Sequence, residues 1–504
     1  MSHEPAPSDQ TPRPDPAELA ERASHRHVVV IGGGVGGLIA ARECVKVGMR
    51  VTVLEAADAV GGAIRRAELD GVVLDAGAES YATRGGHVRA LVTELGLADR
   101  IVRPAAGGAW VSGIPGVGAA PLPAGGILGI PSNPFQEDVR RVIGWSGVWR
   151  AYLDRVRPPL TIGHSHSLGK LVASRMGAKV RDRLVAPVTT GVYSASPDDV
   201  DVDVAAPGLN AALTSVGSLS GAVQALRDEG AAKAAKAQTP GAAVEGLVGG
   251  MSVLSDALVA DIEKLGGVVR TGIRVTDVSR DGDAWTVRTD ADADEHADLA
   301  ELTADGVVVA TSESVARELL VAAAPALAAT ETETATAPEI EIVTLLLRAS
   351  SLSGAPRGTG VLTVPGSHTA KALTHSTAKW KWVREAAGDR HVVRVSFGAQ
   401  GEPAATSTLD DDGAARLALR EAAALLGLPL RDEDLVAAHR SRFVQSQPAS
   451  IIGSAERRDA ARTAVQAVPG LAAVGAWLAG TGLAQVVPDA VDEADRLRRA
   501  LLWD

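Results

Sequence analysis

The sequence predicts an α/β protein in which a helical insertion and a strand-rich insertion interrupt a domain of the nucleotide-binding type. Three observations lead to this prediction. Short β-branched runs at 27–31 (HVVVI) and 50–54 (RVTVL) flank a glycine-rich turn, and a similar run returns at 305–310 (DGVVVA). Residues 115–230 show helical periodicity, whereas residues 340–397 are rich in strand-forming side chains. Glycines also return near the end of the chain, so we expect the nucleotide-binding domain to be discontinuous.

The elements follow in order along the chain. The first strand and its turn lead into a helix at 38–47, Gly48 stops that helix, and the second strand follows, which makes a βαβ unit. A helix is predicted at 249–265, strands at 268–270 and 275–278, and a buried or amphipathic helix at 414–425.

Composition bounds the class of protein. The 504 residues suggest two or three domains, and 46% hydrophobic with 22% charged residues is the balance of an ordinary globular protein. Cys44 is the only cysteine, which excludes a disulfide, a CxxC metal site or an iron–sulfur cluster within one chain and fits a reducing, cytoplasmic compartment. The net charge of −11 argues against a nucleic-acid partner.

Residues 1–24 are rich in Pro, Ala and acidic residues and lack the basic start and apolar run of a signal peptide, so we expect a disordered tail. No apolar run reaches the ~18 residues that span a bilayer. Residues 138–183 nevertheless hold ten Lys/Arg against three Asp/Glu, a local balance of +7. This stretch is either a solvated helical face or a surface that meets anionic substrate or lipid head groups, and peripheral membrane contact is therefore one expectation.

The glycine-rich turn fits a dinucleotide. Gly32, Gly34 and Gly37 make G-x-G-x-x-G between strand and helix, where the helix N-terminus favours phosphate. Glu55 ends the second strand and can accept both ribose hydroxyls. The predicted contacts here are Gly32, Gly33, Gly34, Val35, Gly36, Gly37, Glu55 and Ala56.

A second set of motifs points to FAD rather than NAD. Gly61-Gly62 would let the chain pass close to a longer cofactor, and Asp75-Ala-Gly-Ala-Glu-Ser80 follows a short strand. This series resembles the flavin amine oxidase and protoporphyrinogen oxidase superfamily, where the second stretch runs against the flavin. The resemblance implies further FAD contacts at Gly62, Ala63, Gly77, Ala78, Glu79 and Ser80.

The other end of the chain carries the same resemblance. Residues 475–486 (GAWLAGTGLAQV) resemble the closing flavin motif of that superfamily, although Ala484 and Val486 stand where porphyrinogen oxidases usually have Pro or Asn and then Cys. The contacts implied are Gly480, Thr481, Gly482 and Leu483, and Val275 takes the place of a residue whose backbone pairs with adenine. Because Cys44 belongs to the first helix, the FAD is expected to be non-covalent.

The fold implied is a Rossmann-like FAD-binding domain of the p-hydroxybenzoate hydroxylase type, with a mixed-sheet substrate domain and a helical insertion domain. We expect the FAD-binding domain at 25–112, 235–312 and 455–504. The helical domain, of substrate or membrane type, is expected at 113–234, and the substrate-binding domain at 313–454.

Several segments resemble the porphyrinogen oxidases in particular, and most of all actinobacterial coproporphyrinogen III oxidases. They are 122–131, 187–197 (PVTTGVYSASP), 246–251, 358–362, 374–380 and 394–398. The resemblance implies oxidation of coproporphyrinogen III in haem biosynthesis, by hydride transfer to flavin N5 with dioxygen as acceptor and hydrogen peroxide as co-product. It also implies handover of the product to a ferrochelatase.

Alternatives stay open beside this function. Protoporphyrinogen IX is the second substrate, and an amine oxidase, a carotenoid-desaturase-like enzyme or a flavoprotein without turnover are the other classes. Three tyrosines in the whole chain make the aromatic cage of an amine oxidase hard to build.

Flavin does the chemistry in the implied reaction, so no catalytic side chain is predicted. The substrate's propionates need cations. Candidates are Arg140, Arg141, Arg175, Arg181, Arg183, Lys371 and Lys379, of which Arg175 and Lys379 are the specific predictions, with surface charge as the alternative for each. His375 stands where the family commonly has Trp and is predicted to face the substrate or to be a histidine of the core or of the surface. His164-x-His166 is interpreted as a pair in a loop, and no metal site is predicted.

Overall fold

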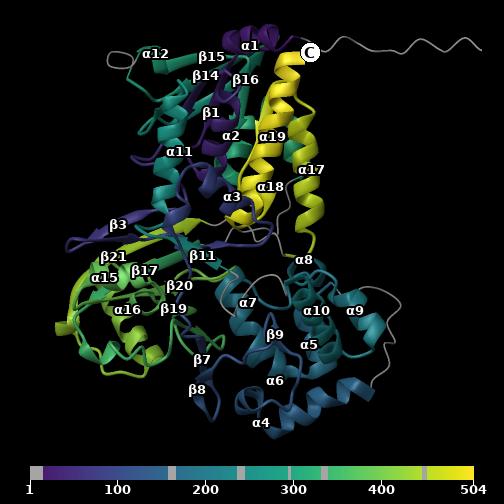
Figure 1. Ribbon diagram of the computed structural model, residues 1–504, viewed down its shortest axis with the longest axis vertical. Coiled ribbons are helices and arrows are strands. Elements are labelled where there is room, and N and C mark those ends of the chain that lie inside the picture. The colour runs from purple at the N-terminus through teal and green to yellow at the C-terminus, as the bar shows by residue number, and fades with distance from the viewer. Residues whose placement is uncertain are drawn as a thin grey trace, which may run out of the picture.

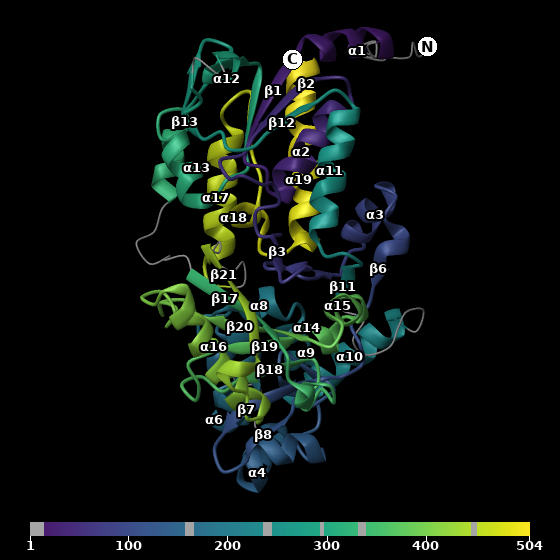
Figure 2. The same cartoon turned by 90° about the vertical axis from the view of Figure 1, so that its left-hand side faces the viewer.

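The computed structural model describes residues 15–156, 166–234, 244–292, 297–330, 339–444 and 451–503. The molecule has three regions, placed at the two ends of its longest axis (Figures 1 and 2). A parallel sheet with its helices occupies one end, and a mixed sheet and a helical region share the other. The predicted mixed α/β fold class is confirmed by this architecture.

The parallel sheet has the order β12-β2-β1-β16-β22, and its strands come from widely separated parts of the chain. Most of their residues are buried, as expected of β-branched runs in a sheet covered on both faces. The predicted strands at both ends of the βαβ unit and at 268–270 and 305–310 are present. The bounds are β1 His27–Ile31, β2 Arg50–Leu54, β12 Val268–Arg270, β16 Gly306–Val309 and β22 Leu471–Ala473.

Helices cover one face of this sheet and a small antiparallel sheet covers much of the other. Val28 and Val30 point into a core shared with the first group of helices, whereas Val29 and Ile31 point into a core shared with the small sheet. The elements around the first core are α2 Val35–Val45, α3 His87–Glu94, α11 Ser252–Lys264 and α19 Leu483–Trp503. The elements around the second core are the strands of the small sheet, β13 Val275–Asp281, β14 Ala284–Thr289 and β15 Glu301–Ala304, with the helices α13 Glu313–Leu320 and α17 Ser454–Gln466.

The mixed sheet has seven strands in the order β21-β17-β20-β19-β18-β7-β8, and β18 and β7 are its parallel pair. Helix α16 (Asp411–Leu426) packs its alanine and leucine face on this sheet, as predicted for a helix at 414–425. The strands are β7 Ala109–Ile114, β8 Gly118–Pro121, β17 Glu339–Leu347, β18 Gly360–Thr363, β19 Ala372–His375, β20 His391–Phe397 and β21 Leu435–Val444. Two short helices, α14 Ser376–Lys379 and α15 Lys381–Ala387, lie between β19 and β20.

The helical region has its own apolar core, to which most of its helices contribute. Its elements are α4 Glu137–Tyr152, η2 Leu153–Val156, α5 Leu168–Met176, α6 Ala178–Val180, η3 Arg181–Val185, α7 Ala186–Tyr193, α8 Val202–Ala205, α9 Leu209–Val216 and α10 Leu219–Ala234. The remaining short strands and helices are β3 Arg66–Leu69, β4 Val72–Asp75, β5 Tyr81–Ala82, β6 Ile101–Val102, β9 Gly126–Ile127, β10 Ile130–Pro131, β11 Val244–Leu247, α12 Ala297–Ala300, and α18 Ala476–Ala479.

The prediction that residues 1–24 are disordered is wrong for residues 16–24. Helix α1 covers Pro16–His25, with Asp15 capping its first turn and Pro16 at the first helical position. Its Ala23 is buried against the core of the first helix group, and Arg22 donates to the Leu502 carbonyl at 3.3 Å. Packing on the last helix therefore orders a segment whose composition predicts disorder. Residues 1–14 of the predicted tail lie outside the described residues.

Within the described residues, none of the helices has the length and apolar character that crossing a bilayer requires.

Candidate functional site

The glycine-rich turn after β1 leaves room at the N-terminus of α2. Gly32 has φ +108° and Gly37 lies so close to it that a Cβ on Gly37 would be 2.1 Å from the Gly32 carbonyl oxygen. Gly34 is the N-cap of α2, and no side chain of the described residues caps the helix there. No described atom lies within 4 Å of where a Gly34 Cβ would stand. The first N–H groups of α2 therefore face open space, the arrangement that binds a phosphate.

The second glycine pair lies against this turn. Gly61 donates its N–H to the Gly33 carbonyl at 2.8 Å, and Gly34 and Gly61 form a parallel bridge. A Cβ on Gly62 would be 3.3 Å from the Cα of Gly34. Two motifs that are about 30 residues apart in the sequence thus form one surface made of backbone.

Glu55 stands beside the turn at the carboxyl end of β2. Its carboxylate accepts the N–H of Gly33 at 2.6 Å and that of Ala57 at 2.8 Å. A carboxylate has about four lone-pair sites, so these two bonds leave capacity for two hydroxyls. The segment that leads to Val275 runs alongside, because Ile273 donates to the Glu55 carbonyl at 2.9 Å.

The closing motif meets the opening motif in space. A Cβ on Gly36 would stand 3.2 Å from a methyl of Val486 and 3.5 Å from Gly475, so the first turns of α2 and α19 adjoin. Gly480 and Gly482 have φ of +99° and +104°, a backbone region that favours glycine. Thr481 between them is exposed, and Leu483 begins α19.

The loop that carries Asp75 to Ser80 is fixed from two sides. Asp75 accepts the N–H of Met251 at 2.8 Å, and burial, partly offset by this bond, raises its pKa to about 7. Ala78 donates to the Ala63 carbonyl at 2.9 Å, and a Cβ on Gly77 would lie 2.1 Å from that same oxygen. Only glycine fits at position 77 while the two segments stay this close.

Glu79 connects this loop to the mixed sheet. Its carboxylate accepts from Lys379 Nζ at 2.5 Å, from Arg394 Nη1 at 3.0 Å and from the Ser376 hydroxyl at 3.3 Å. Burial alone would raise the pKa of Glu79, but the two cations outweigh it and lower that pKa to about 2. Arg394 also donates to the carbonyls of Ala76 and Gly77. The predicted substrate residue Lys379 and the predicted FAD residue Glu79 are therefore partners.

Lys371 is a half-buried cation of a different kind. It lies where the end of α7 meets β19, and its Nζ donates to the Ser194 hydroxyl at 2.6 Å. Burial lowers its pKa to about 7. Among the described residues, no carboxylate pairs with it. An anion that reached this ammonium would gain a partner that has no competing counter-ion.

Two predicted substrate residues lie in the protein interior. Arg175 lies inside the helical region, where its Nε is 2.5 Å from Asp154 Oδ1 and its Nη2 donates to the Gly217 carbonyl at 2.6 Å. The buried Asp154 holds this guanidinium in the core. His375 is fully buried, with its ring 5.8 Å from that of His391. Burial, together with His391 and Arg384, lowers the pKa of His375 to about 4, which agrees with the core alternative for this residue.

The remaining basic candidates lie in the helical region. Arg181 pairs with Asp182 at 2.6 Å, and Arg183 donates to the Val142 carbonyl at 3.2 Å. Arg140 lies over the ring of Trp145, and Arg141 pairs with Glu137 at 3.5 Å.

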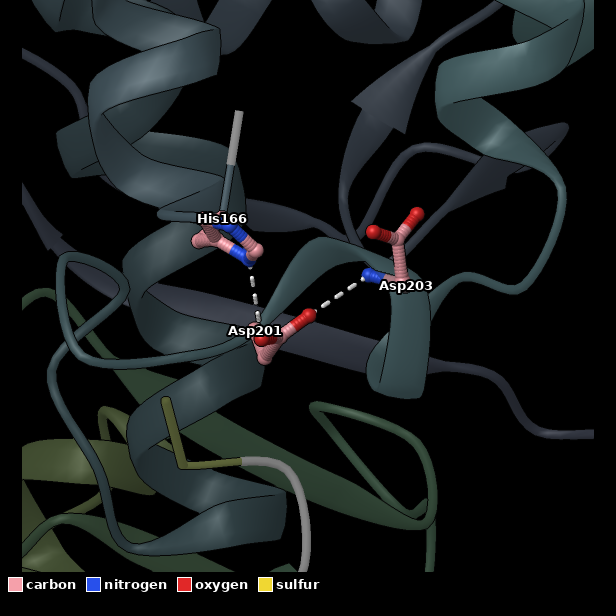
Figure 3. Close-up of side chains that lie close together, drawn as sticks. All are labelled: His166, Asp201 and Asp203. Atoms are coloured by element: carbon pink, nitrogen blue, oxygen red, sulfur yellow. Dashed lines mark hydrogen bonds and ion pairs between the residues drawn. The ribbon is translucent and has the colours of Figure 1, made fainter. Parts of the chain in front are cut away.

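His166 has neighbours that the sequence did not indicate. Ligand atoms of His166, Asp201 and Asp203 lie within 4.8 Å of one another (Figure 3). Each acid also has a structural partner: Asp201 caps α8 through the Asp203 N–H at 2.8 Å, and Asp203 accepts from Asn210 at 2.9 Å. These bonds account for the cluster without an ion. His164, the other histidine of the predicted pair, lies outside the described residues.

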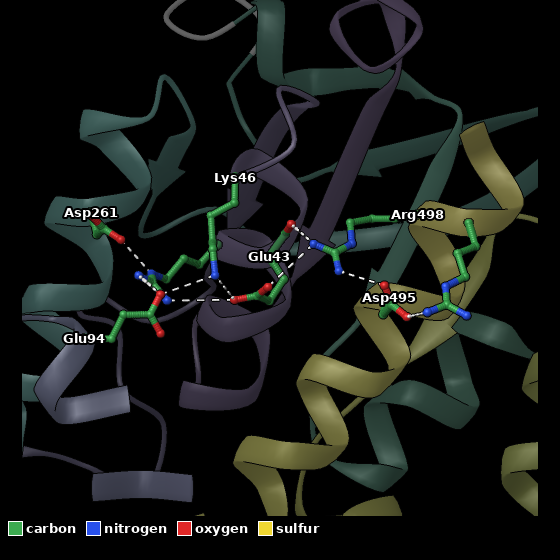
Figure 4. A network of polar contacts seen from close by, with 8 residues as sticks. Glu43, Lys46, Glu94, Asp261, Asp495 and Arg498 are labelled. Carbon is green, nitrogen blue, oxygen red and sulfur yellow. Dashed lines mark hydrogen bonds and ion pairs between the residues drawn. The ribbon is translucent and has the colours of Figure 1, made fainter. Parts of the chain in front are cut away.

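Ion pairs hold α2 in place beneath the turn (Figure 4). The buried Arg42 reaches Asp261 of α11 at 2.6 Å and Glu94 of α3 at 2.9 Å. Arg498 of α19 donates to the Glu43 carbonyl at 2.6 Å. Because the two ion pairs and this hydrogen bond link α2 to three neighbouring helices, the helix N-terminus at Gly34 has a fixed direction.

Arg394 is the residue of this site that sequence reasoning passed over. In the sequence, the segment that contains it indicates only a resemblance to the porphyrinogen oxidases. A single charge in the middle of an apolar strand predicts a buried ionic partner, and Arg394 within HVVRVSF is such a charge.

Comparison with known proteins places these motifs in context. The model of the family described as flavin containing amine oxidoreductase matches residues 35–498. Coproporphyrinogen III oxidase from Mycobacterium leprae (strain TN) is 30% identical over 94% of this chain and 98% of its own length. The enzyme of the same name from Bacillus subtilis (strain 168) is 26% identical over 93% of this chain and 96% of its own.

Solved structures share the fold. A putative protoporphyrinogen oxidase from Exiguobacterium sp. 255-15 superposes with a TM-score of 0.80 at 23% identity, covering 94% of this chain and 99% of that one. Cyclohexylamine oxidase from Brevibacterium oxydans IH-35A gives a TM-score of 0.63 at 15% identity, covering 94% and 99%. At these identities the likeness shows the fold alone.

Proposed function

The chain belongs to the family of flavin-containing amine oxidoreductases, and from that premise we propose that it is an FAD-dependent enzyme that oxidises coproporphyrinogen III to coproporphyrin III with dioxygen as acceptor. The predicted resemblance to the porphyrinogen oxidases is confirmed by relatives of that name that align over almost their whole length. A flavin cofactor follows from the family. The observation that carries the proposal is the convergence of the glycine motifs near Gly34, Gly61 and Gly475 at one edge of the parallel sheet.

The residues present fit FAD. The open space above Gly34 and the uncapped N-terminus of α2 suit a pyrophosphate, and Glu55 suits the ribose hydroxyls. The backbone near Val275, beside Glu55, suits the adenine. We assign the flavin end to the loop that contains Gly77 and to the turn at Gly480, and propose that binding is non-covalent.

Bound FAD supplies the acceptor for two electrons at a time, and the protein supplies position and a dry site. In this proposal Glu79, held by Lys379 and Arg394, fixes the flavin loop against the mixed sheet. The first turn of α19 would direct its N–H groups toward the flavin end of a bound FAD, where the helix dipole would favour added negative charge. Asp75 fixes the start of the loop through the N-terminus of α11.

Lys371 is our candidate for holding a propionate of the substrate. It is half-buried and lacks a carboxylate partner among the described residues, so a propionate would favour its charged form. The mixed sheet presents Thr344 and Thr374 on the same face as Arg394, so these three residues would make a polar part of the site. Lys379, already paired with Glu79, is a positioning residue in this account.

The test is a side-by-side assay of two substrates. The flavin released from denatured protein should be FAD, and kcat/KM should be higher for coproporphyrinogen III, with three hydrogen peroxide molecules for each porphyrin because six electrons leave in pairs. Lys371→Met should lower kcat/KM for coproporphyrinogen III by about 10- to 100-fold, the value of a charge-assisted hydrogen bond. Lys381→Met, a change at an exposed lysine on α15, is the matched control.

Protoporphyrinogen IX is the second candidate substrate. A protoporphyrinogen oxidase from Arabidopsis thaliana is 27% identical over 47% of this chain, and this similarity supports protoporphyrinogen IX as the second candidate. Protoporphyrinogen IX has two propionates where coproporphyrinogen III has four. A higher kcat/KM for protoporphyrinogen would therefore replace the proposed substrate, and oxidation of neither would remove the proposed function.

A further inference from the structure

Glu79, Lys379 and Arg394, which we call the Glu79 triad, hold one more cation than anion. Glu79 accepts from Lys379 Nζ at 2.5 Å and from Arg394 Nη1 at 3.0 Å. The side chains of Glu79, Lys379 and Arg394 are 12%, 20% and 7% exposed, and among the described residues no second carboxylate pairs with either cation. Burial opposes the charged form of Glu79, but the two cations outweigh it and lower its pKa to about 2. Two positive charges and one negative charge therefore leave the triad with a net charge of +1.

The triad lies against the loop that we assign to the flavin end of FAD. Arg394 donates to the carbonyls of Ala76 and Gly77 in that loop. A Cβ on Gly77 would lie 2.1 Å from the Ala63 carbonyl oxygen, so the loop is in contact with the segment that follows the second glycine pair. That pair in turn borders the turn assigned to the pyrophosphate. The triad therefore stands beside the path that we assign to FAD, on the side of the loop that meets the mixed sheet.

Asp75, at the start of the same loop, leaves this charge uncancelled at mildly acidic pH. Burial raises the pKa of Asp75 to about 7, although the N–H of Met251 and the charge of Arg394 act in the opposite direction. At pH 6 most of Asp75 is therefore protonated and uncharged, whereas Glu79 is ionised. At that pH the loop has the single positive charge of the triad beside it.

A positive charge in this place would act on the two redox states of a flavin unequally. A flavin that takes up electrons gains negative charge, so a fixed cation nearby favours the reduced form. Because the triad is largely buried, water screens it weakly. One unit charge at about 10 Å in such a site changes an equilibrium constant by the order of ten-fold. A single cation would be enough to pair with Glu79, and the second one gives the triad its charge.

We propose that the net positive charge of the Glu79 triad stabilises the reduced form of bound FAD and so raises its reduction potential. This inference rests on the proposed function, because it requires the flavin end of FAD beside this loop. The alternative is a purely mechanical role, in which the triad only holds the loop against the mixed sheet. Loss of either partner would then loosen the same loop and shift the potential in the same direction. The electrostatic role predicts shifts of opposite sign for loss of a cation and loss of the anion.

The experiment measures the reduction potential of FAD in the holoenzyme at pH 6, by anaerobic equilibration with a reference dye while the flavin absorbance is followed. Lys379→Met leaves the triad without net charge. At a fixed potential it should lower the ratio of reduced to oxidised FAD about ten-fold, which is about 30 mV for a two-electron couple. Glu79→Gln leaves two cations and should raise that ratio by a similar factor. Lys379→Arg keeps the charge and should keep the wild-type potential.

Lys381→Met is the matched control. Lys381 is two residues from Lys379 in the sequence, but its side chain is 90% exposed and pairs with Glu385 at 3.4 Å. Water and salt screen such a charge, so its removal should leave the potential unchanged. Thermal unfolding and the FAD content of each variant check that it is folded and loaded. If Glu79→Gln does not retain FAD, the comparison of Lys379→Met with Lys379→Arg decides.

Three results would overturn the inference. The first is a potential that Lys379→Met leaves unchanged, and the second is a shift of the same sign in Lys379→Met and Glu79→Gln. The third is a Lys379→Arg protein that has the potential of Lys379→Met. Any of these in a protein that holds FAD and oxidises coproporphyrinogen III would leave the proposed function in place, whereas a protein that binds no FAD would overturn both.

Discussion

Glu79→Gln should destabilise the protein by an amount that depends on pH in a defined way. The ordinary pKa of a glutamate is 4.5 and that of Glu79 is about 2, because Lys379 and Arg394 favour its charged form. This difference corresponds to about 3 kcal/mol of folding stability at neutral pH. The glutamine keeps the shape of the side chain but leaves two largely buried cations without their anion.

The stability that Glu79 contributes is present above pH 4.5 and is lost as pH falls toward 2, since its folded pKa is the depressed one. More than half of it should be lost by about pH 3. The assay is urea unfolding of the wild type and the variant at matched pH values between 7 and 3. The other carboxylates titrate in both proteins, so their contribution cancels when the free energy of unfolding of the variant is subtracted from that of the wild type. A difference below about 1 kcal/mol at pH 7, or one that does not shrink on acidification, would refute this reasoning.

Three further substitutions follow from the same structure. Gly34→Val should abolish flavin retention while the circular dichroism spectrum stays unchanged, because a side chain there enters the space assigned to the pyrophosphate; normal flavin content would contradict that assignment. Gly77→Ala puts a Cβ 2.1 Å from a backbone carbonyl oxygen and should lower the thermal midpoint, whereas Gly230→Ala, in an open helical position, should leave it unchanged or raise it. Arg175→Met should cost about 3–5 kcal/mol of stability, measured by urea unfolding, since it strands the buried Asp154, and should leave KM for coproporphyrinogen III unchanged. A raised KM in a folded Arg175 variant would return that residue to the substrate site.

The parts of the fold that could be predicted are those that local sequence determines. β-Branched runs predict the strands of the parallel sheet, and G-x-G-x-x-G between a strand and a helix predicts the turn at Gly34. For residues 16–24 the prediction of disorder failed because it rested on composition alone. The helix that these residues form is stabilised by packing on α19, at the other end of the chain.

The charged residues show why the rest could not be predicted. In the sequence, Arg175 is one arginine of a basic stretch, and nothing local shows that Asp154 accompanies it into a core. Glu79 and Lys379 are 300 residues apart, so their pairing depends on how the mixed sheet meets the flavin loop. Burial and partner decide the role of a charged side chain, and both are properties of the tertiary structure.

Anaerobic mixing of the flavin-loaded protein with coproporphyrinogen III tests the central claim most directly. The account predicts that the visible absorbance of the flavin bleaches in a single turnover, that air restores it with release of hydrogen peroxide, and that the Gly34→Val protein shows neither change. Flavin absorbance that persists in the presence of coproporphyrinogen III and of protoporphyrinogen IX would contradict the claim that this chain is a porphyrinogen oxidase.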